Sequence, residues 1–294
     1  MGMKKFLIVT ADDFGLHAAI NEAVEQASRA GVLTAASLMV AAPAAADAIR
    51  RAHELPDLRV GLHVVLADGR SVLPRGLIPA LVDETGRFGG RMFLDGLRYF
   101  ALPAVRRQLA AEIRAQFQAF ARTGLVLDHV NAHKHFHLHP SLLEMLLRIG
   151  REFGVRAVRV PREPVWFAMR AGGPLAGSVG AALFAPWLAL MRRRLRAAGI
   201  VHNDQVFGIA CSGSMGEARL LEIVARLPPG VTEIYLHPAT ESGAAIAASM
   251  SAYRHCDELA ALLSPRVRAA IAQADIPCGG YRDLVEAREQ RRAA

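Results

Sequence analysis

Short apolar runs alternate along this chain with longer segments in which apolar residues recur every three or four positions. Residues 6–10 predict a buried strand, residues 12–15 a turn, and residues 21–29 a helix. The same order recurs as far as the C-terminal region. Strands that alternate with helices are typical of a mostly parallel sheet with helical connections. The pattern therefore predicts an α/β protein.

About seven strands are predicted in all. The other strands are expected at residues 34–40, 59–66, 125–130, 157–160, 205–210 and 232–236. Further helices are expected at residues 44–54, 105–122, 217–226 and 250–263, and after Pro140. This alternation favours a (β/α) barrel, complete or incomplete, over an open sheet. We expect one domain that spans residues 1–294.

Two segments interrupt the alternation. Residues 83–96 are rich in glycine and charge and predict a long loop, of the kind that often covers or binds a ligand. The other is an insertion around residues 162–201, in which residues 172–191 carry no charge and three arginines follow. Glycines and prolines break this apolar stretch. It can be interpreted as a membrane span, a buried helical insertion, or an apolar segment that faces a membrane or covers the site.

Composition limits the class of protein. The chain has 294 residues, of which 52% are hydrophobic, so it can bury a large core. Its three cysteines are scattered, which predicts neither a disulfide framework nor a structural zinc site. The apolar run near the N-terminus is short and two aspartates follow it, which is not typical of a secretory signal. We expect a cytoplasmic protein.

The basic charge does not identify a partner by itself. The formal net charge is +8, but only three of the 35 basic residues are lysines, and the arginines are spread along most of the chain. No recognition-helix pattern is present and only 6% of the residues are aromatic. We therefore expect no nucleic-acid partner and favour peripheral contact with an anionic membrane, at its inner face. Oligomeric state is not predicted.

Polar residues suited to chemistry directly follow the predicted strands. They are Asp12, Asp13, His63, the run from His133 to His139, Arg159 and His237. In a parallel barrel the carboxyl ends of the strands meet at one face, so these distant residues are expected to lie together.

Each residue also has a simpler interpretation. An Asp-Asp pair after a strand is often a helix cap, His63 could be a core histidine, and Arg159 could be an exposed charge at a strand end. The histidine run is different. Its four histidines, at alternate positions from 133 to 139, would point one way on an extended chain, and such density is rarely structural.

Adjacent aspartates repel unless a positive charge faces them. A bound metal ion supplies that charge. One carboxylate with two histidines is the open ligand set of catalytic zinc or iron sites, whereas magnesium or manganese prefers more oxygen ligands. The second carboxylate would then be free to act as a base.

Four stretches of the chain resemble a known family. They are residues 10–15, 61–63, 128–137 and 236–238, and together they extend over nearly the whole chain in the expected order. They are similar to the YdjC-like carbohydrate deacetylases, which include chitooligosaccharide deacetylases and hopanoid-biosynthesis-associated deacetylases. The resemblance implies a distorted TIM-like barrel, as in polysaccharide deacetylases. It also implies removal of acetyl groups from N-acetylated sugars with the help of a divalent metal ion.

The resemblance also implies roles for individual residues. Asp13, His63 and His133 would bind the metal ion. Asp12 would be the general base and His237 the general acid. Zinc and magnesium are the ions expected most, with manganese or cobalt as alternatives.

Three further residues would support this site. Arg159 would orient Asp12 or the substrate, and His135 and His137 would contact the substrate or the metal ligands. The sequence of residues 131–140 is most similar to the hopanoid-associated branch. With the apolar insertion and its arginines, it suggests the N-acetylglucosaminyl headgroup of a membrane lipid as substrate.

Two other functions remain open. One is a metal-dependent hydrolase of another bond, such as a phosphoester or a cyclic amide. The other is a non-catalytic glycolipid-binding protein, which the open three-ligand set disfavours because structural zinc sites usually have four protein ligands.

Overall fold

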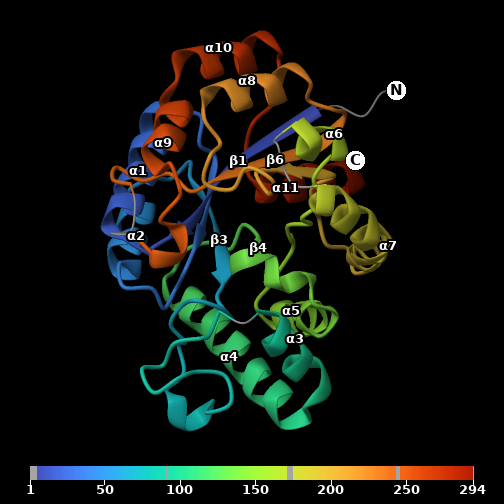
Figure 1. Cartoon of the computed structure of the whole chain (residues 1–294). Helices are drawn as coiled ribbons and strands as arrows, with labels where there is room; N and C mark the ends of the chain where they lie inside the picture. The colour runs from blue at the N-terminus through green and yellow to red at the C-terminus, as the bar shows by residue number, and fades with distance from the viewer. Residues whose placement is uncertain (1–4, 91, 171–174, 243–245, 294) are drawn as a thin grey trace.

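Strands and helices alternate along the chain, as Figure 1 shows. The computed structural model describes residues 5–90, 92–170, 175–242 and 246–293. The strands are β1 Lys5–Phe14, β2 Ala35–Leu38, β3 Arg59–Val64, β4 Val130–Ala132, β5 Gln205–Phe207 and β6 Gly230–Leu236. The α-helices are α1 Ala18–Ala30, α2 Ala45–His53, α3 Met92–Ala101, α4 Pro103–Arg122, α5 Pro140–Glu152, α6 Val165–Arg170, α7 Leu175–Ala197, α8 Glu217–Ala225, α9 His255–Leu263, α10 Pro265–Gln273 and α11 Tyr281–Ala293. Three short 3₁₀ helices are η1 Arg75–Leu77, η2 His133–Leu138 and η3 Ala248–Met250.

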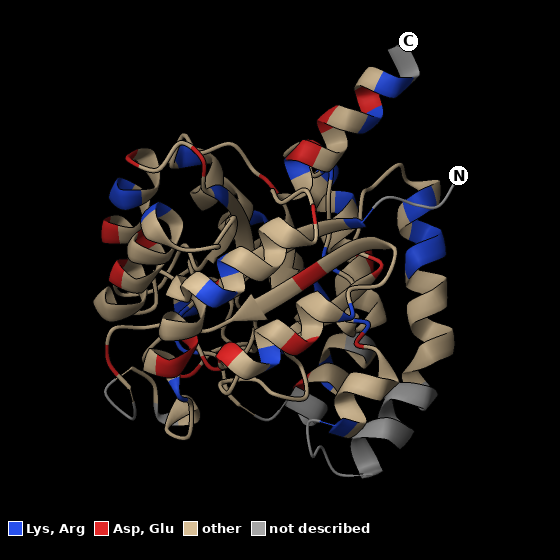
Figure 2. Ribbon diagram, turned by 90° about the horizontal axis from the view of Figure 1, so that it is seen from above, with Lys and Arg blue, Asp and Glu red and all other residues tan. Residues whose placement is uncertain are grey.

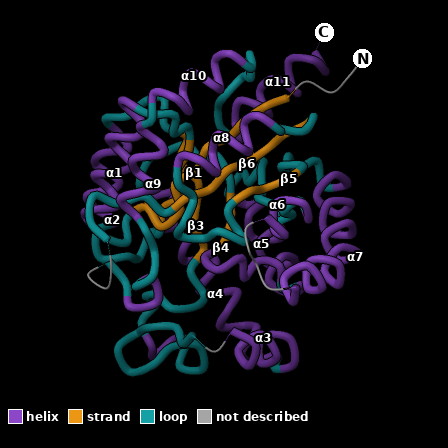
Figure 3. The backbone as a smooth tube through the Cα atoms, turned by 45° about the horizontal axis from the view of Figure 1, so that its top comes forward, coloured by secondary structure: helices purple, strands orange, loops and turns teal. Residues whose placement is uncertain are grey.

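The strands form one curled, parallel sheet. Their order is β4-β3-β2-β1-β6-β5, and every pair of neighbours is parallel. Helices lie around the outside of the strands (Figure 3), and the residues of β1, β3 and β6 are buried along nearly their whole length, which explains why these strands are largely runs of apolar residues. The prediction of an α/β fold with a distorted TIM-like barrel is confirmed. The barrel is incomplete, and its sheet has six strands among the described residues rather than about seven.

An irregular segment fills the gap between the two edge strands. The amide of Val130 in β4 donates to the carbonyl of Ala157, and the amide of Arg159 donates back to Val130. On the other side, the amide of Val206 in β5 donates to the carbonyl of Arg162. The strand predicted at residues 157–160 is therefore present only as isolated bridges, because too few residues pair on each side to form a regular ladder.

The N-terminal end of α11 closes the end of the barrel at which the strands begin. Tyr281 is fully buried there against Ile8 of β1, Ala35 of β2 and Ala157 of the irregular segment. The candidate site residues lie at the opposite end of the barrel, where the strands end.

Other predicted boundaries were wrong in places. Residues 92–96 belong to α3 rather than to a loop, and the helix expected from residue 250 begins only at His255. The strand expected at residues 125–130 lies at Val130–Ala132, because hydrogen bonding to β3 begins only with the amide of Asp128. The apolar insertion forms α7 beyond residue 174, and no helix among the described residues is long and apolar enough to cross a membrane.

Candidate metal centre and catalytic cleft

A bulge at the end of β1 brings two adjacent carboxylates into one site. Pairing between β1 and β2 shifts in register between Ala11 and Phe14, and Asp13 has a left-handed backbone with a φ of 61°. In a regular strand Asp12 and Asp13 would point to opposite faces. Both are buried, and α1 is capped by His17 instead, so the interpretation of these aspartates as a helix cap was wrong.

Asp13, His63 and His133 form a compact cluster at the ends of β1, β3 and β4. Asp13 Oδ1 lies 3.2 Å from His63 Nε2 and 3.0 Å from His133 Nδ1. One potential ligand atom from each residue lies within 4.8 Å of the others. The structure therefore brings together the three residues expected to bind a metal ion.

The donor set fits a divalent cation. Asp13 Oδ2 is buried and has no hydrogen-bond partner among the described residues, so a ligand oxygen remains available. Burial opposes charge on both Asp13 and His63. Even so, His133 and His63 hold the pKa of Asp13 well below its usual value, and the carboxylates of Asp12 and Asp13 raise the pKa of His63. The pocket thus favours an anionic oxygen beside a positive charge, which is the arrangement that a cation site needs.

Asp12 is held by a buried arginine. Arg159 Nη1 donates to Asp12 Oδ2 at 2.5 Å, and Nη2 donates to Oδ1 at 3.0 Å. Burial raises the pKa of Asp12, but Arg159 outweighs burial and holds it far below its usual range. Arg159 is itself 0% exposed, so the interpretation of it as an exposed strand-end charge was wrong. Asp12 is therefore an ionised hydrogen-bond acceptor whose orientation is fixed.

His237 follows β6 and faces the same cluster. Its Nε2 lies 3.8 Å from Asp13 Oδ2, and its Nδ1 is buried with no hydrogen-bond partner among the described residues. Burial lowers the pKa of this imidazole, against the opposing effect of Asp13 and Asp12. The backbone at His237 is fixed by Glu258, which accepts its amide at 2.5 Å, and by His255, whose Nδ1 donates to its carbonyl at 2.5 Å.

The histidine run is not extended, so the expectation that its histidines point one way was wrong. It forms η2, in which Lys134 and His135 both have a left-handed φ of 54°. His133 joins the cluster, and His135 Nε2 lies 3.1 Å from the hydroxyl of Tyr235. His137 instead donates from Nε2 to the carbonyl of Arg159 at 3.0 Å. The fully buried His137 therefore supports the backbone, and it does not line the cavity beside the cluster.

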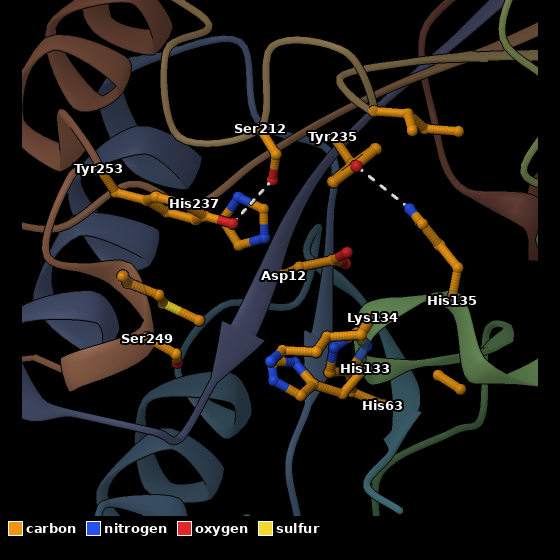
Figure 4. A pocket seen from close by; sticks show the side chains of 13 residues that line it. Asp12, His63, His133, Lys134, His135, Ser212, Tyr235, His237, Ser249 and Tyr253 are labelled. Carbon is orange, nitrogen blue, oxygen red and sulfur yellow. Dashed lines mark hydrogen bonds between the residues drawn. The ribbon is translucent and has the colours of Figure 1, made fainter. Parts of the chain in front are cut away.

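A cavity of about 160 Å³ opens over these residues. In Figure 4, Asp12 lies between His237 on one side and His135 on the other, with His63 and His133 below. The far wall carries Ser212 and Tyr253, whose hydroxyls are 3.0 Å apart. The remaining lining residues are Ala132, Lys134, Ile209, Tyr235, Ser249 and Met250. A polar cleft beside a cation site suits a hydroxyl-rich ligand.

Sequence reasoning gave no role to several residues of this site. Glu233 accepts from Arg159 Nε at 2.9 Å and Nη2 at 2.7 Å, and it also accepts from the hydroxyl of Tyr281 at 2.6 Å. Asn131 contacts both Asp12 and His63. The alternation of β6 was the signal for Glu233, because it places residues 233, 235 and 237 on one face.

Comparison with known proteins points to one family. The profile of the YdjC-like protein family matches residues 6–273. A carbohydrate deacetylase of Geobacillus stearothermophilus is 29% identical over 284 residues, which cover 96% of this chain and 99% of that protein. A carbohydrate deacetylase of Mus musculus is 32% identical over 310 aligned positions, which cover 95% of this chain and 94% of that protein.

A solved structure has the same fold. The crystal structure of a putative cellobiose-phosphate cleavage protein from Enterococcus faecalis superposes with a TM-score of 0.75. The superposition covers 96% of this chain and 99% of that chain, at 24% sequence identity.

Proposed function

Because the chain belongs to the YdjC-like protein family, and its relatives include carbohydrate deacetylases, we propose that it hydrolyses the N-acetyl group of an N-acetylglucosamine-type sugar and releases acetate. The observation that carries this proposal is the cluster of Asp13, His63 and His133 beside Asp12 in a polar cleft. We also propose that the whole chain acts as one catalytic domain.

One divalent cation would be held by Asp13, His63 and His133. Zinc and magnesium are the first candidates. When bound, such an ion polarises a carbonyl and acidifies water. Asp12 is fixed and ionised, so it accepts the proton of the attacking water. His237, on the other side of the cleft, would be the acid that gives the departing amine its proton. His135 and Tyr235 line the cavity and would hold sugar hydroxyls.

An acetate-release assay tests this function. We expect N,N′-diacetylchitobiose to yield acetate with protein that carries a divalent ion, and none with metal-stripped protein. Restoring the ion should restore the activity. Phosphate release from a phosphorylated sugar without acetate release would support a different metal-dependent hydrolase. Binding of the sugar without any cleavage would support a glycolipid-binding protein.

A more specific substrate is favoured by the surface of α6 and α7. Phe184 is 54% exposed, Met169 is 62% exposed, and Leu190 is also exposed. Residues 164–203 contain five arginines and no acidic residue, and Figure 2 shows arginines gathered at the C-terminal end of α7. Exposed apolar side chains beside arginines match an anionic bilayer.

This surface is connected to the site. Trp187 Nε1 in α7 donates to the carbonyl of Leu138, the last residue of the segment that carries His133 and His135. We therefore propose that the enzyme contacts the membrane at its inner face and acts on an N-acetylglucosaminyl lipid, in the hopanoid-associated branch of the family.

Vesicle co-sedimentation tests this contact. We expect binding to vesicles with anionic lipids and much weaker binding to neutral vesicles. Phe184→Glu should weaken binding about tenfold or more. It removes apolar area that the bilayer would bury, and it adds a negative charge that anionic lipids repel. Val126→Glu is the matched control, since Val126 is 62% exposed on another part of the surface. Equal sedimentation of both variants and the unaltered protein would contradict the proposal.

A further inference from the structure

A chain of buried polar side chains runs through the barrel beneath the cleft. It consists of Asp128, His129, Ser37 and Asn131, whose exposed fractions are 3%, 1%, 0% and 0%. His129 Nδ1 lies 2.8 Å from Asp128 Oδ2, and His129 Nε2 lies 3.0 Å from Ser37 Oγ. Asn131 Nδ2 lies 2.9 Å from Ser37 Oγ. Beyond Asn131 the chain reaches Asp12 and His63.

Chemistry fixes the direction of every hydrogen bond in this chain. Both carboxylate oxygens of Asp12 accept from Arg159, so the amide end of Asn131 that faces Asp12 at 3.2 Å is the NH₂ group. The amide oxygen of Asn131 then faces His63 Nδ1 at 2.6 Å and only accepts. His63 Nδ1 must therefore carry a hydrogen, and the neutral ring has its lone pair on Nε2. This is the nitrogen that faces Asp13.

The other end of the chain is fixed in the same way. Asp128 accepts the backbone amides of Tyr281 at 3.2 Å and Arg282 at 2.7 Å, so it caps α11 as an anion. His129 therefore donates to it from Nδ1 and accepts the Ser37 hydroxyl hydrogen at Nε2. Ser37 Oγ in turn accepts the second amide hydrogen of Asn131. Each contact among Asp128, His129, Ser37 and Asn131 thus pairs one donor with one acceptor. Only at the end of the chain do two acceptors meet, where His63 Nε2 faces Asp13 Oδ1, and a bound cation would satisfy both.

Asp128, His129 and Ser37 have the hydrogen-bond pattern of a hydrolase triad, but they are not placed to attack a substrate. None of them lines the cavity beside the metal cluster, and Ser37 is fully enclosed. Gly61 leaves the space that the His129 ring occupies, because a Cβ there would lie 2.5 Å from ring atoms of His129. The fold therefore makes room for this imidazole in its interior.

We propose that Asp128, His129 and Ser37 form a positioning relay. By orienting Asn131, the relay fixes which nitrogen of His63 is free to bind the cation, and it holds Asp12 in place. The proposal rests on the metal site of the proposed function. Groups that orient a metal-ligating histidine commonly change metal affinity by about 10- to 100-fold when they are removed.

Ser37→Ala tests the relay, because it removes one hydroxyl and leaves every other group in place. We expect zinc affinity, measured by competition with a chelating dye, to fall about tenfold or more. Thr232→Val is the matched control. Thr232 is also fully buried, and its hydroxyl accepts Gln205 Nε2 at 3.0 Å outside the relay. It should lower thermal stability to a similar extent and leave zinc affinity unchanged. Equal zinc affinity of Ser37→Ala and the unaltered protein would overturn the proposal.

A second measurement needs neither a variant nor a metal ion. Nitrogen-15 NMR of the metal-free protein at pH 9 reports which ring nitrogen of each neutral histidine carries hydrogen. We expect His129 and His63 both to carry it on Nδ1, whereas free imidazole side chains prefer Nε2. Hydrogen on Nε2 of His129, or a His63 ring without hydrogen on Nδ1, would overturn the relay. If the unaltered protein binds no zinc at all, the metal site fails, and the NMR result still decides the relay separately.

Discussion

Asp12 and Asp13 are neighbours in the sequence and yet have opposite surroundings. Asp12 is paired with a guanidinium, whereas Asp13 faces imidazoles and keeps one oxygen free of hydrogen bonds to described residues. The two carboxylates are therefore suited to different tasks. Asp13 is available as a ligand, and Asp12 is an oriented acceptor.

Asp12→Asn should separate these tasks. The amide cannot accept the proton of water, so we expect kcat to fall by about 100-fold or more while the fold and metal content are kept. Asp13→Asn should instead lose the metal ion. Turnover measured alongside metal analysis distinguishes the two variants. Near-normal kcat in Asp12→Asn would remove Asp12 from the role of base.

His137 predicts a dependence of stability on pH. Burial lowers the pKa of its imidazole from 6.5 to about 4. Between pH 6.5 and 4 the unfolded chain therefore binds a proton that the folded chain does not, and the free energy of unfolding falls as the pH is lowered. The resulting loss of unfolding free energy is at most about 3 kcal/mol at pH 4, and there is no such loss above pH 6.5.

Chemical denaturation between pH 4 and pH 8 measures this effect. His137→Gln keeps a donor for the carbonyl of Arg159 but does not titrate in this range, so its stability should depend less on acid. Parallel pH profiles for His137→Gln and the unaltered protein would show that His137 is not buried in its neutral form.

At the scale of elements, the sequence predicted what short-range patterns determine. The apolar runs of β1, β3 and β6 were identified because both faces of these strands are buried. The conformation of His133–Leu138 was not predicted, since it is held by contacts with distant segments: the left-handed His135 contacts Tyr235, and His137 contacts the carbonyl of Arg159. Residues 157–160 likewise depend on partners in β4 and near Val201.

Substitution of Gly61 tests how tightly β3 packs against the His129 side chain. A methyl group at this position would collide with the His129 ring, so Gly61→Ala should lower the free energy of unfolding by about 1–3 kcal/mol. A methyl group on Gly76 in η1 would meet no atom within 4 Å, and Gly76→Ala should change stability little. Equal stability of the two variants by urea denaturation would contradict this packing.

At the scale of the whole molecule, the half-barrel gathers residues that are far apart in sequence. Asp13 and His63 lie at the ends of β1 and β3, and His133 and His237 directly follow β4 and β6. Their convergence was predicted from the carboxyl ends of the strands. The polar interior was not predicted. Glu233, Ser37 and Tyr281 acquire their roles only when the strands curl around them and α11 closes the end.

Metal binding should stabilise the folded protein as a whole. An ion present at about 100 times its Kd adds about 2.7 kcal/mol, which corresponds to a rise in Tm of about 5 °C. Calorimetry with and without zinc measures this shift, and Asp13→Asn should abolish it. A shift that persists in Asp13→Asn would place the ion elsewhere.

The most direct test is anomalous diffraction from crystals grown with zinc, recorded on both sides of the zinc absorption edge. We predict one strong peak about 2.0–2.2 Å from Asp13 Oδ2 or Oδ1, His63 Nε2 and one ring nitrogen of His133, with a coordination position open toward the cleft. A peak remote from these three side chains, or a fourth protein ligand that closes the site, would contradict the account.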